Sequence, residues 1–190
     1  MRYLYALVGV AVLLCAALAS AVTFNPFNPD MTVATYVDAA KANASFGDDD
    51  TLWAASTDGK PVKEVYLTFN NTFGAARVFN PSKVKTATLK LNAKDVSKPG
   101  SIKAYFIPEA TMKIVTWNDK LEYNSSVSAS LDVQKVGVYP MDVTPVIKAA
   151  VKACPESCPY TIVLVADGNA SIGFSKDDSQ KPSLEFTAVD

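Results

Sequence analysis

The chain has 190 residues, with 18 basic and 19 acidic side chains, no histidine and a formal net charge of −1. The lack of histidine excludes Ser-His-Asp and Cys-His catalytic sites and any imidazole ligand to a metal. The near-zero charge, with no basic stripe along the sequence, argues against a nucleic-acid partner.

The first 21 residues have the pattern of a secretory signal peptide. Arg2 supplies a minimal basic region, residues 4–18 are an almost unbroken apolar run, and Ala19-Ser20-Ala21 is a small-residue cleavage site. We expect cleavage before Val22, which predicts an extracellular or cell-surface protein with no membrane contact once the peptide is removed. The alternative is an uncleaved signal anchor, because the apolar run approaches the ~20 residues that span a bilayer.

Residues 22–31 form a proline-rich arm ahead of the main domain, which we place at residues 32–190. An arm of this kind can add to the sheet edge of a neighbouring subunit, and head-to-tail addition would build a fibre. Phe24 and Phe27 are its predicted anchors, although Pro26 and Pro29 each lack the backbone N–H that strand pairing uses. The alternative is that the arm wraps its own domain.

Three consecutive carboxylates, Asp48, Asp49 and Asp50, follow in a turn-like segment. Hard oxygen ligands of this kind suit calcium, which is the one cofactor that the sequence suggests. The alternative is a charged, solvated loop, because Asp is common in exposed turns. A glycosidase that uses carboxylates alone would need no histidine, but most acids here stand in such strings, so we expect no enzymatic activity.

Short segments with apolar residues at every second position run through the rest of the chain. Val65, Leu67 and Phe69, for example, alternate with their neighbours as in a strand that has one face in a core. Turn residues separate the segments at spacings that favour a β-sandwich over βαβ units. The predicted segments are Thr35–Asp38, Glu64–Asn70, Val84–Leu91, Ile102–Ile107, Val115–Asn118, Tyr139–Ala153 with a helix in its second part, Thr161–Phe174 and Pro182–Thr187.

The predicted helix lies between Asp142 and the cysteine pair. Thr144 is a good N-cap, and Pro145 is tolerated in the first turn of a helix. Once cleavage has removed Cys15, Cys154 and Cys158 form an even pair in an oxidising compartment. They are therefore predicted to form a local disulfide.

Four acceptor sequons for N-linked glycans agree with secretion. They begin at Asn43, Asn70, Asn124 and Asn169. Such sites need exposed turns or strand ends. Chance is the alternative, because Asn, Ser and Thr are abundant in β-rich sequences.

The order of the segments, with the Asp142-Val143-Thr144 step before the helix, resembles the DNRLRE domains, also described as disaggregatase-related carbohydrate-binding modules. The resemblance covers nearly the whole chain after residue 32. It implies an all-β, two-sheet antiparallel jelly-roll sandwich with one short helix, which binds polysaccharide or another glycan without catalysis. It also implies that Trp117 belongs to the core. The alternative function is a structural subunit of an extracellular fibre or sheath, assembled through residues 22–31.

Sugar-binding sandwiches stack pyranose rings on exposed aromatic faces, because sugar C–H groups pack against π faces. The candidates in this chain are Trp53, Tyr66, Tyr105 and Tyr123. Tyr66 and Tyr105 fall opposite the apolar alternation of their segments, so we expect both to be exposed.

Overall fold

The computed structural model describes residues 24–70, 80–107, 115–153 and 160–189. These residues form an antiparallel all-β fold with a single α-helix, which confirms the predicted fold class. The elements are β1 (Phe24–Phe27), β2 (Asp30–Asp38), η1 (Ala39–Lys41), β3 (Thr51–Thr57), β4 (Lys60–Asn70), η2 (Pro81–Lys83), β5 (Val84–Lys98), β6 (Gly100–Ile107), β7 (Asn124–Val133), β8 (Gly137–Asp142), α1 (Thr144–Ala153), β9 (Tyr160–Ala166), β10 (Ser171–Ser175) and β11 (Ser183–Val189).

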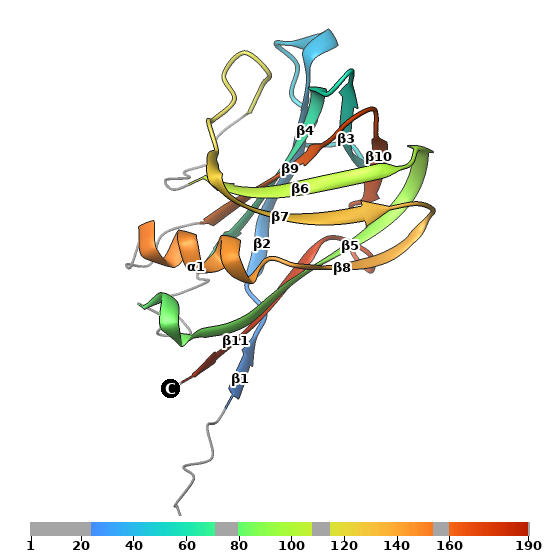
Figure 1. Ribbon diagram of the computed structural model, residues 1–190. Coiled ribbons are helices and arrows are strands. Elements are labelled where there is room, and N and C mark those ends of the chain that lie inside the picture. The colour runs from blue at the N-terminus through green and yellow to red at the C-terminus, as the bar shows by residue number, and fades with distance from the viewer. Residues whose placement is uncertain (1–23, 71–79, 108–114, 154–159, 190) are drawn as a thin grey trace, which may run out of the picture.

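The strands form one hydrogen-bonded sheet that folds over into two layers (Figure 1). In the first layer, β5 pairs with β8 on one side and with β11 and β10 on the other, while β1 extends from β11 and β3 from β10. In the second layer the order is β2-β4-β9-β6-β7. Only the end of β3 pairs with β4, and this short contact joins the layers.

A two-residue turn fixes this junction between β3 and β4. Asp58 and Gly59 both have positive φ angles, 50° and 73°, which an Asp-Gly hairpin turn requires. The Gly59 N–H donates to the Gly168 carbonyl at 2.8 Å, and the Asp58 N–H donates to Asn169 Oδ1 at 2.7 Å. The β3–β4 turn is therefore locked to the β9–β10 turn.

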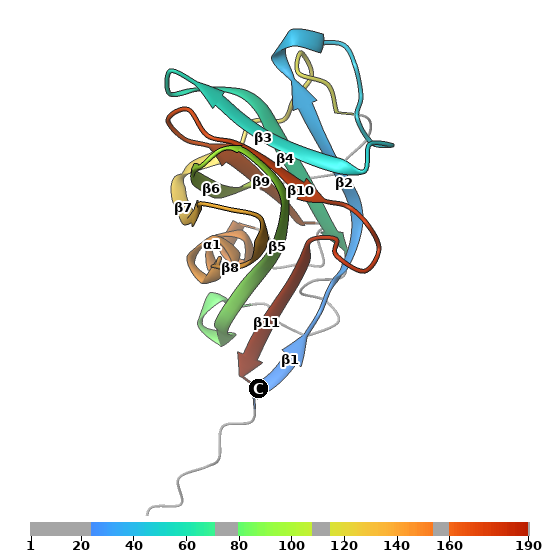
Figure 2. The same ribbon diagram turned by 90° about the vertical axis from the view of Figure 1, so that its right-hand side faces the viewer.

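The core lies between the layers and is filled by the apolar residues at alternate positions of the strands, as predicted. Val65, Leu67 and Phe69 of β4 are fully buried, facing Leu89 and Leu91 of β5 in the same apolar cluster. Helix α1 closes one side of the sandwich, where it packs on β5, β6 and β7 (Figure 2). The helix is held at its start because the Ala87 N–H donates to Thr144 Oγ1 at 2.9 Å.

The observed elements differ from the predicted ones in two ways. Val115–Asn118 is not a strand: it is an irregular segment whose Asn118 N–H donates to the Ala42 carbonyl at 3.1 Å. Strands β1, β3 and β7 lie outside the predicted segments, although apolar and polar residues alternate in β7 from Val127 to Val133. Within the described residues, no helix has the length and apolar character needed to cross a membrane.

Candidate functional site

Trp53 of β3 lies on the outer face of the first layer, opposite the buried Leu52 and Ala54. Its partner in register is Gly173 of β10, which in turn pairs with Asp95 of β5. A Cβ placed on Gly173 would lie 3.2 Å from Trp53 Cη2 and 3.3 Å from Asp95 Cβ. The six-membered ring of the indole therefore lies over β10, where it rests against the sheet surface and covers the buried Gly173.

A charged group lies close to this indole. Lys63 Nζ is 5.8 Å from the centroid of the Trp53 ring and 3.1 Å from Asp38 Oδ2. Trp53 itself is half-buried and packs against the main core. We call Trp53, Gly173 and Asp95 the indole platform, because they combine an aromatic surface with a carboxylate on the same face.

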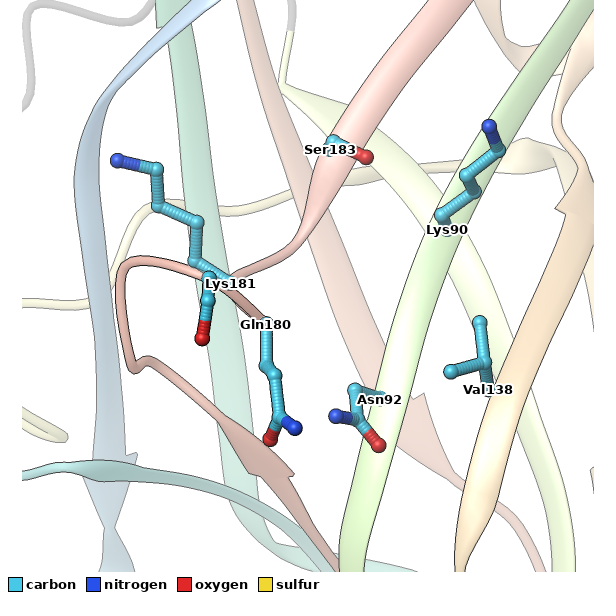
Figure 3. A pocket seen from close by; sticks show the side chains of 7 residues that line it. Lys90, Asn92, Val138, Gln180, Lys181 and Ser183 are labelled. Carbon is cyan, nitrogen blue, oxygen red and sulfur yellow. The ribbon is translucent and has the colours of Figure 1, made fainter.

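A hollow of about 350 Å³ lies further along the outer face of the first layer. We call it the polar hollow, and Figure 3 shows the side chains that line it. Asn92 and Gln180 approach one another from β5 and from the β10–β11 loop, whereas Lys90 and Lys181 extend away in different directions (Figure 3). The lining residues are Lys90, Asn92, Val138, Ser179, Gln180, Lys181 and Ser183.

Register explains why these side chains meet. Lys90 of β5 lies opposite Ser183 of β11, and Asn92 lies opposite Val138 of β8. All of them point away from the core, because the intervening Leu91 is fully buried. Val138 is 69% exposed, so the hollow has an apolar wall beside its amides and hydroxyls.

The charges around the polar hollow are paired. Lys90 Nζ lies 3.5 Å from Glu185 Oε2, and Lys181 Nζ lies 3.2 Å from Asp178 Oδ1. Both pairs are exposed and hold the lysines only weakly. The two cations and two carboxylates cancel, so the hollow offers many donors and acceptors without an excess of either charge.

The indole platform and the polar hollow belong to one continuous face. Asp95 follows Asn92 by three residues on β5, and such a spacing would place them on opposite faces of a regular strand. The pairing with β10 skips Lys94 at this point, so β5 is bulged and both side chains lie on the outer face. Between them, Lys94 Nζ donates to the Asp50 carbonyl at 3.0 Å. Together they form an elongated polar surface with an aromatic ring at one end.

Tyr66 is fully buried, so the prediction that it is exposed is wrong. It lies on the outer face of the second layer, as the alternation requires, but residues 115–123 cover that face. Tyr66 packs with Val115 and Val163 in a second apolar cluster. Its hydroxyl donates to Glu64 Oε2 at 3.0 Å, and burial with this carboxylate raises the tyrosine pKa far above its usual range.

Tyr105 and Tyr123 pack against this second cluster, and their rings stack on one another. Both are half-buried, and their centroids are 4.6 Å apart in a stacked arrangement. Burial raises the pKa of Tyr123, with a smaller contribution from the Glu64 carboxylate. One face of each ring is therefore occupied by the other tyrosine, and sugar binding by Tyr105 or Tyr123 stays a prediction.

Trp117 is half-buried in the same cluster. Lys120 Nζ lies 3.8 Å from the centroid of its ring and 2.7 Å from Glu64 Oε1. The Glu64 side chain is only 2% exposed. This ion pair clamps the covering segment onto the sheet.

The acidic turn does not gather into a metal site. Asp48, Asp49 and Asp50 are exposed, and no three acidic or cysteine side chains in the described part of the chain are placed to hold an ion. Asp49 instead accepts a hydrogen bond from the Tyr36 hydroxyl at 2.8 Å. Calcium binding at this turn stays a prediction.

The remaining predicted sites are placed as follows. Strand β1, with Phe24 and Phe27 at its ends, pairs with β11 of its own chain. The asparagines of all four sequons, Asn43, Asn70, Asn124 and Asn169, are exposed. Cys154 and Cys158 lie outside the described residues, so their disulfide stays a prediction.

Sequence reasoning identified Trp53 but missed Gly173, Asp95, Asn92 and Gln180. The alternation in β5 shows that Asn92 is exposed, but only strand register brings it to the β10–β11 loop. The sequence signal for Gly173 is an isolated glycine within a strand, which often marks close packing above the backbone.

The chain matches a known protein family. The model of carbohydrate-binding module family 96 matches residues 27–188, from the end of β1 to the last strand. Among curated proteins, no sequence matches this chain. The family match supports the expected class, a carbohydrate-binding module, while the narrower likeness to DNRLRE domains stays a prediction.

Proposed function

The chain belongs to carbohydrate-binding module family 96, and on this premise we propose that it binds an extended polysaccharide along the outer face of its first layer. One sugar ring stacks on Trp53, and its neighbours hydrogen-bond in the polar hollow. The observation that carries the proposal is the indole lying across Gly173, whose register partner Asp95 is on the same strand as Asn92.

The chemistry of this face suits a hydroxyl-rich ligand. A sugar ring offers C–H groups to an aromatic surface and needs hydrogen-bond partners for its hydroxyls. Asn92 and Gln180 each supply two donors and an acceptor oxygen, which suits hydroxyls in either role. Because nearby carboxylates balance the two lysines, we assign the specificity to hydrogen bonding and ring stacking and not to net charge.

We also propose that the protein is extracellular and is not an enzyme. The chain acts outside the cell or at the cell surface, because its first 21 residues have the pattern of a secretory signal. It binds without catalysis. The fibre alternative would require β1 to leave β11 of its own chain and pair with another copy.

Tryptophan fluorescence tests the platform directly, because the chain has only two tryptophans. In a Trp117→Phe variant, Trp53 is the single emitter. We expect its emission to change when soluble glucan, mannan or xylan is added. An acidic polyuronate is tested in the same way. In the matched Trp53→Phe variant, Trp117 should give no response. A response from Trp117 alone would overturn the placement of the site.

Affinity measurements test the two parts of the face separately. Trp53→Ala should weaken binding about tenfold or more, and Gln180→Ala by about 2- to 10-fold, as expected for one lost hydrogen bond. Tyr66→Phe is the control, since Tyr66 is fully buried on the other layer, and it should bind normally. Equal losses for all three variants in isothermal titration calorimetry would refute the assignment.

A further inference from the structure

The four sequons lie away from the strands that build the polar hollow. Asn70 ends β4, Asn124 begins β7, Asn169 stands in the β9–β10 turn, and Asn43 follows η1. None lies on β5, β8 or β11. A fifth Asn-x-Ser triplet begins at Asn80 next to η2, but it has proline in the middle and is no acceptor.

In two sequons, backbone contacts show which atom of the carboxamide faces outward. Asn124 Oδ1 accepts from the Ser126 N–H at 2.9 Å, and Asn169 Oδ1 accepts from the Asp58 N–H at 2.7 Å. A backbone N–H can only donate, so the oxygen of each asparagine is the atom that is held. The nitrogen, to which an N-linked glycan attaches, is left for modification.

Asn43 has the same arrangement with a side-chain partner. Its Oδ1 accepts from Asn118 Nδ2 at 2.7 Å. No hydrogen bond within the described residues uses the Nδ2 atom of Asn43, Asn124 or Asn169, and all three side chains are exposed. A glycan on any of them would leave every one of these contacts intact.

We infer that Asn43, Asn124 and Asn169 carry N-linked glycans after passage through a secretory pathway, and that these glycans leave the outer face of the first layer bare. The second half of this inference rests on the proposed function, because it identifies the bare face as the ligand face. An N-linked glycan is bulky and strongly hydrated, so it would compete with a polysaccharide for the surface beneath it. The position of the sequons therefore keeps the chain's own glycans off its ligand site.

Site mapping tests the first half. The full chain, secreted by a eukaryotic cell line, is treated with peptide:N-glycosidase in ¹⁸O-water, and peptides are sequenced by mass spectrometry. Each former glycan site becomes a labelled aspartate. We expect the label at positions 43, 124 and 169, and an unmodified peptide at any of them overturns the assignment for that site.

A new sequon tests the second half. Lys94→Thr creates an acceptor at Asn92 inside the polar hollow, whereas Lys94→Ala removes the same lysine without one. We expect the glycosylated Lys94→Thr protein to bind polysaccharide at least tenfold more weakly than Lys94→Ala. Normal binding with a glycan on Asn92 would refute the ligand face and leave the three natural sites unaffected.

A second variant covers the case in which Asn92 is not modified. The double substitution Lys90→Asn with Asn92→Thr moves the acceptor to position 90, two residues along the same face. Its control is Lys90→Gln with Asn92→Thr, which has no sequon. The same loss of binding is expected in the glycosylated protein, and normal binding would count against the ligand face in the same way.

Discussion

Replacing Gly173 with alanine tests how the indole platform is built. The added methyl carbon would lie 2.8 Å from Thr51 Cγ2, 3.2 Å from Trp53 Cη2 and 3.3 Å from Asp95 Cβ. Carbon atoms at rest are about 3.5–4.0 Å apart, so these side chains must move. Overpacking of this kind costs about 1–3 kcal/mol, and the gain from removing a strand glycine offsets about 0.5–1 kcal/mol. We expect a net loss of up to about 2.5 kcal/mol in urea unfolding.

The same change should weaken polysaccharide binding, because the methyl group pushes the indole away from β10. A shift that costs about 1.4 kcal/mol of stacking lowers the affinity tenfold. A double-mutant cycle with Trp53→Ala isolates the contact, since the clash with Thr51 is common to both backgrounds. If Gly173→Ala costs the same stability with and without Trp53, and binding is unchanged, the indole does not lie across Gly173 as argued.

Three further changes test other parts of the fold. Lys120→Met leaves the Glu64 carboxylate, which is 2% exposed, without its cation, and should cost about 2–4 kcal/mol in urea unfolding. This is less than the ~3–5 kcal/mol of a fully buried pair, because the Lys120 side chain is 30% exposed. The control Lys85→Met, at an exposed position, should cost less than about 0.5 kcal/mol, and equal costs for the two variants would contradict the clamp. Hydrogen bonds from the Thr144 side chain and backbone lower the pKa of Asp142 below 3.8. The stabilisation by this carboxylate is therefore present above pH 3.8 and is lost as the pH falls through the lower pKa of the folded state. Asp142→Asn should be less stable than the parent protein at about pH 6, and a stability difference that is just as large at about pH 2 would argue against this linkage. The Asn25→Cys and Ala188→Cys pair, which are register partners, should form a disulfide within one chain on a non-reducing gel, whereas covalent oligomers would favour the fibre alternative.

The fold class followed from the sequence because local alternation is enough to recognise strands with one buried face. Val65, Leu67 and Phe69 entered the core as their spacing predicts. Strand β7 was missed although its second part alternates apolar and polar residues from Val127 to Val133. Its place in the sheet comes from its pairing with β6. Local sequence does not contain that pairing.

The candidate site was predicted only in part, for the same reason. Trp53 stands out as an aromatic residue in any strand, but its use as a platform depends on the glycine opposite to it in register. Asn92 and Gln180 are 88 positions apart in the numbering and meet only because β10 and β11 both pair with β5. Composition and periodicity do not predict which strands pair with one another.

The burial of Tyr66 is one reason to place the proposed ligand face on the first layer. In a two-layer sandwich each sheet has one outer face, and alternation alone treats the two faces alike. Here residues 115–123 cover the outer face of the second layer, and the clamp between Lys120 and Glu64 holds that cover in place. The large aromatic rings of that layer are thereby committed to packing. The outer face of the first layer keeps a half-buried indole beside a hollow lined with amides and hydroxyls. It therefore combines the ring and the hydrogen-bonding groups that the proposed binding of a polysaccharide requires.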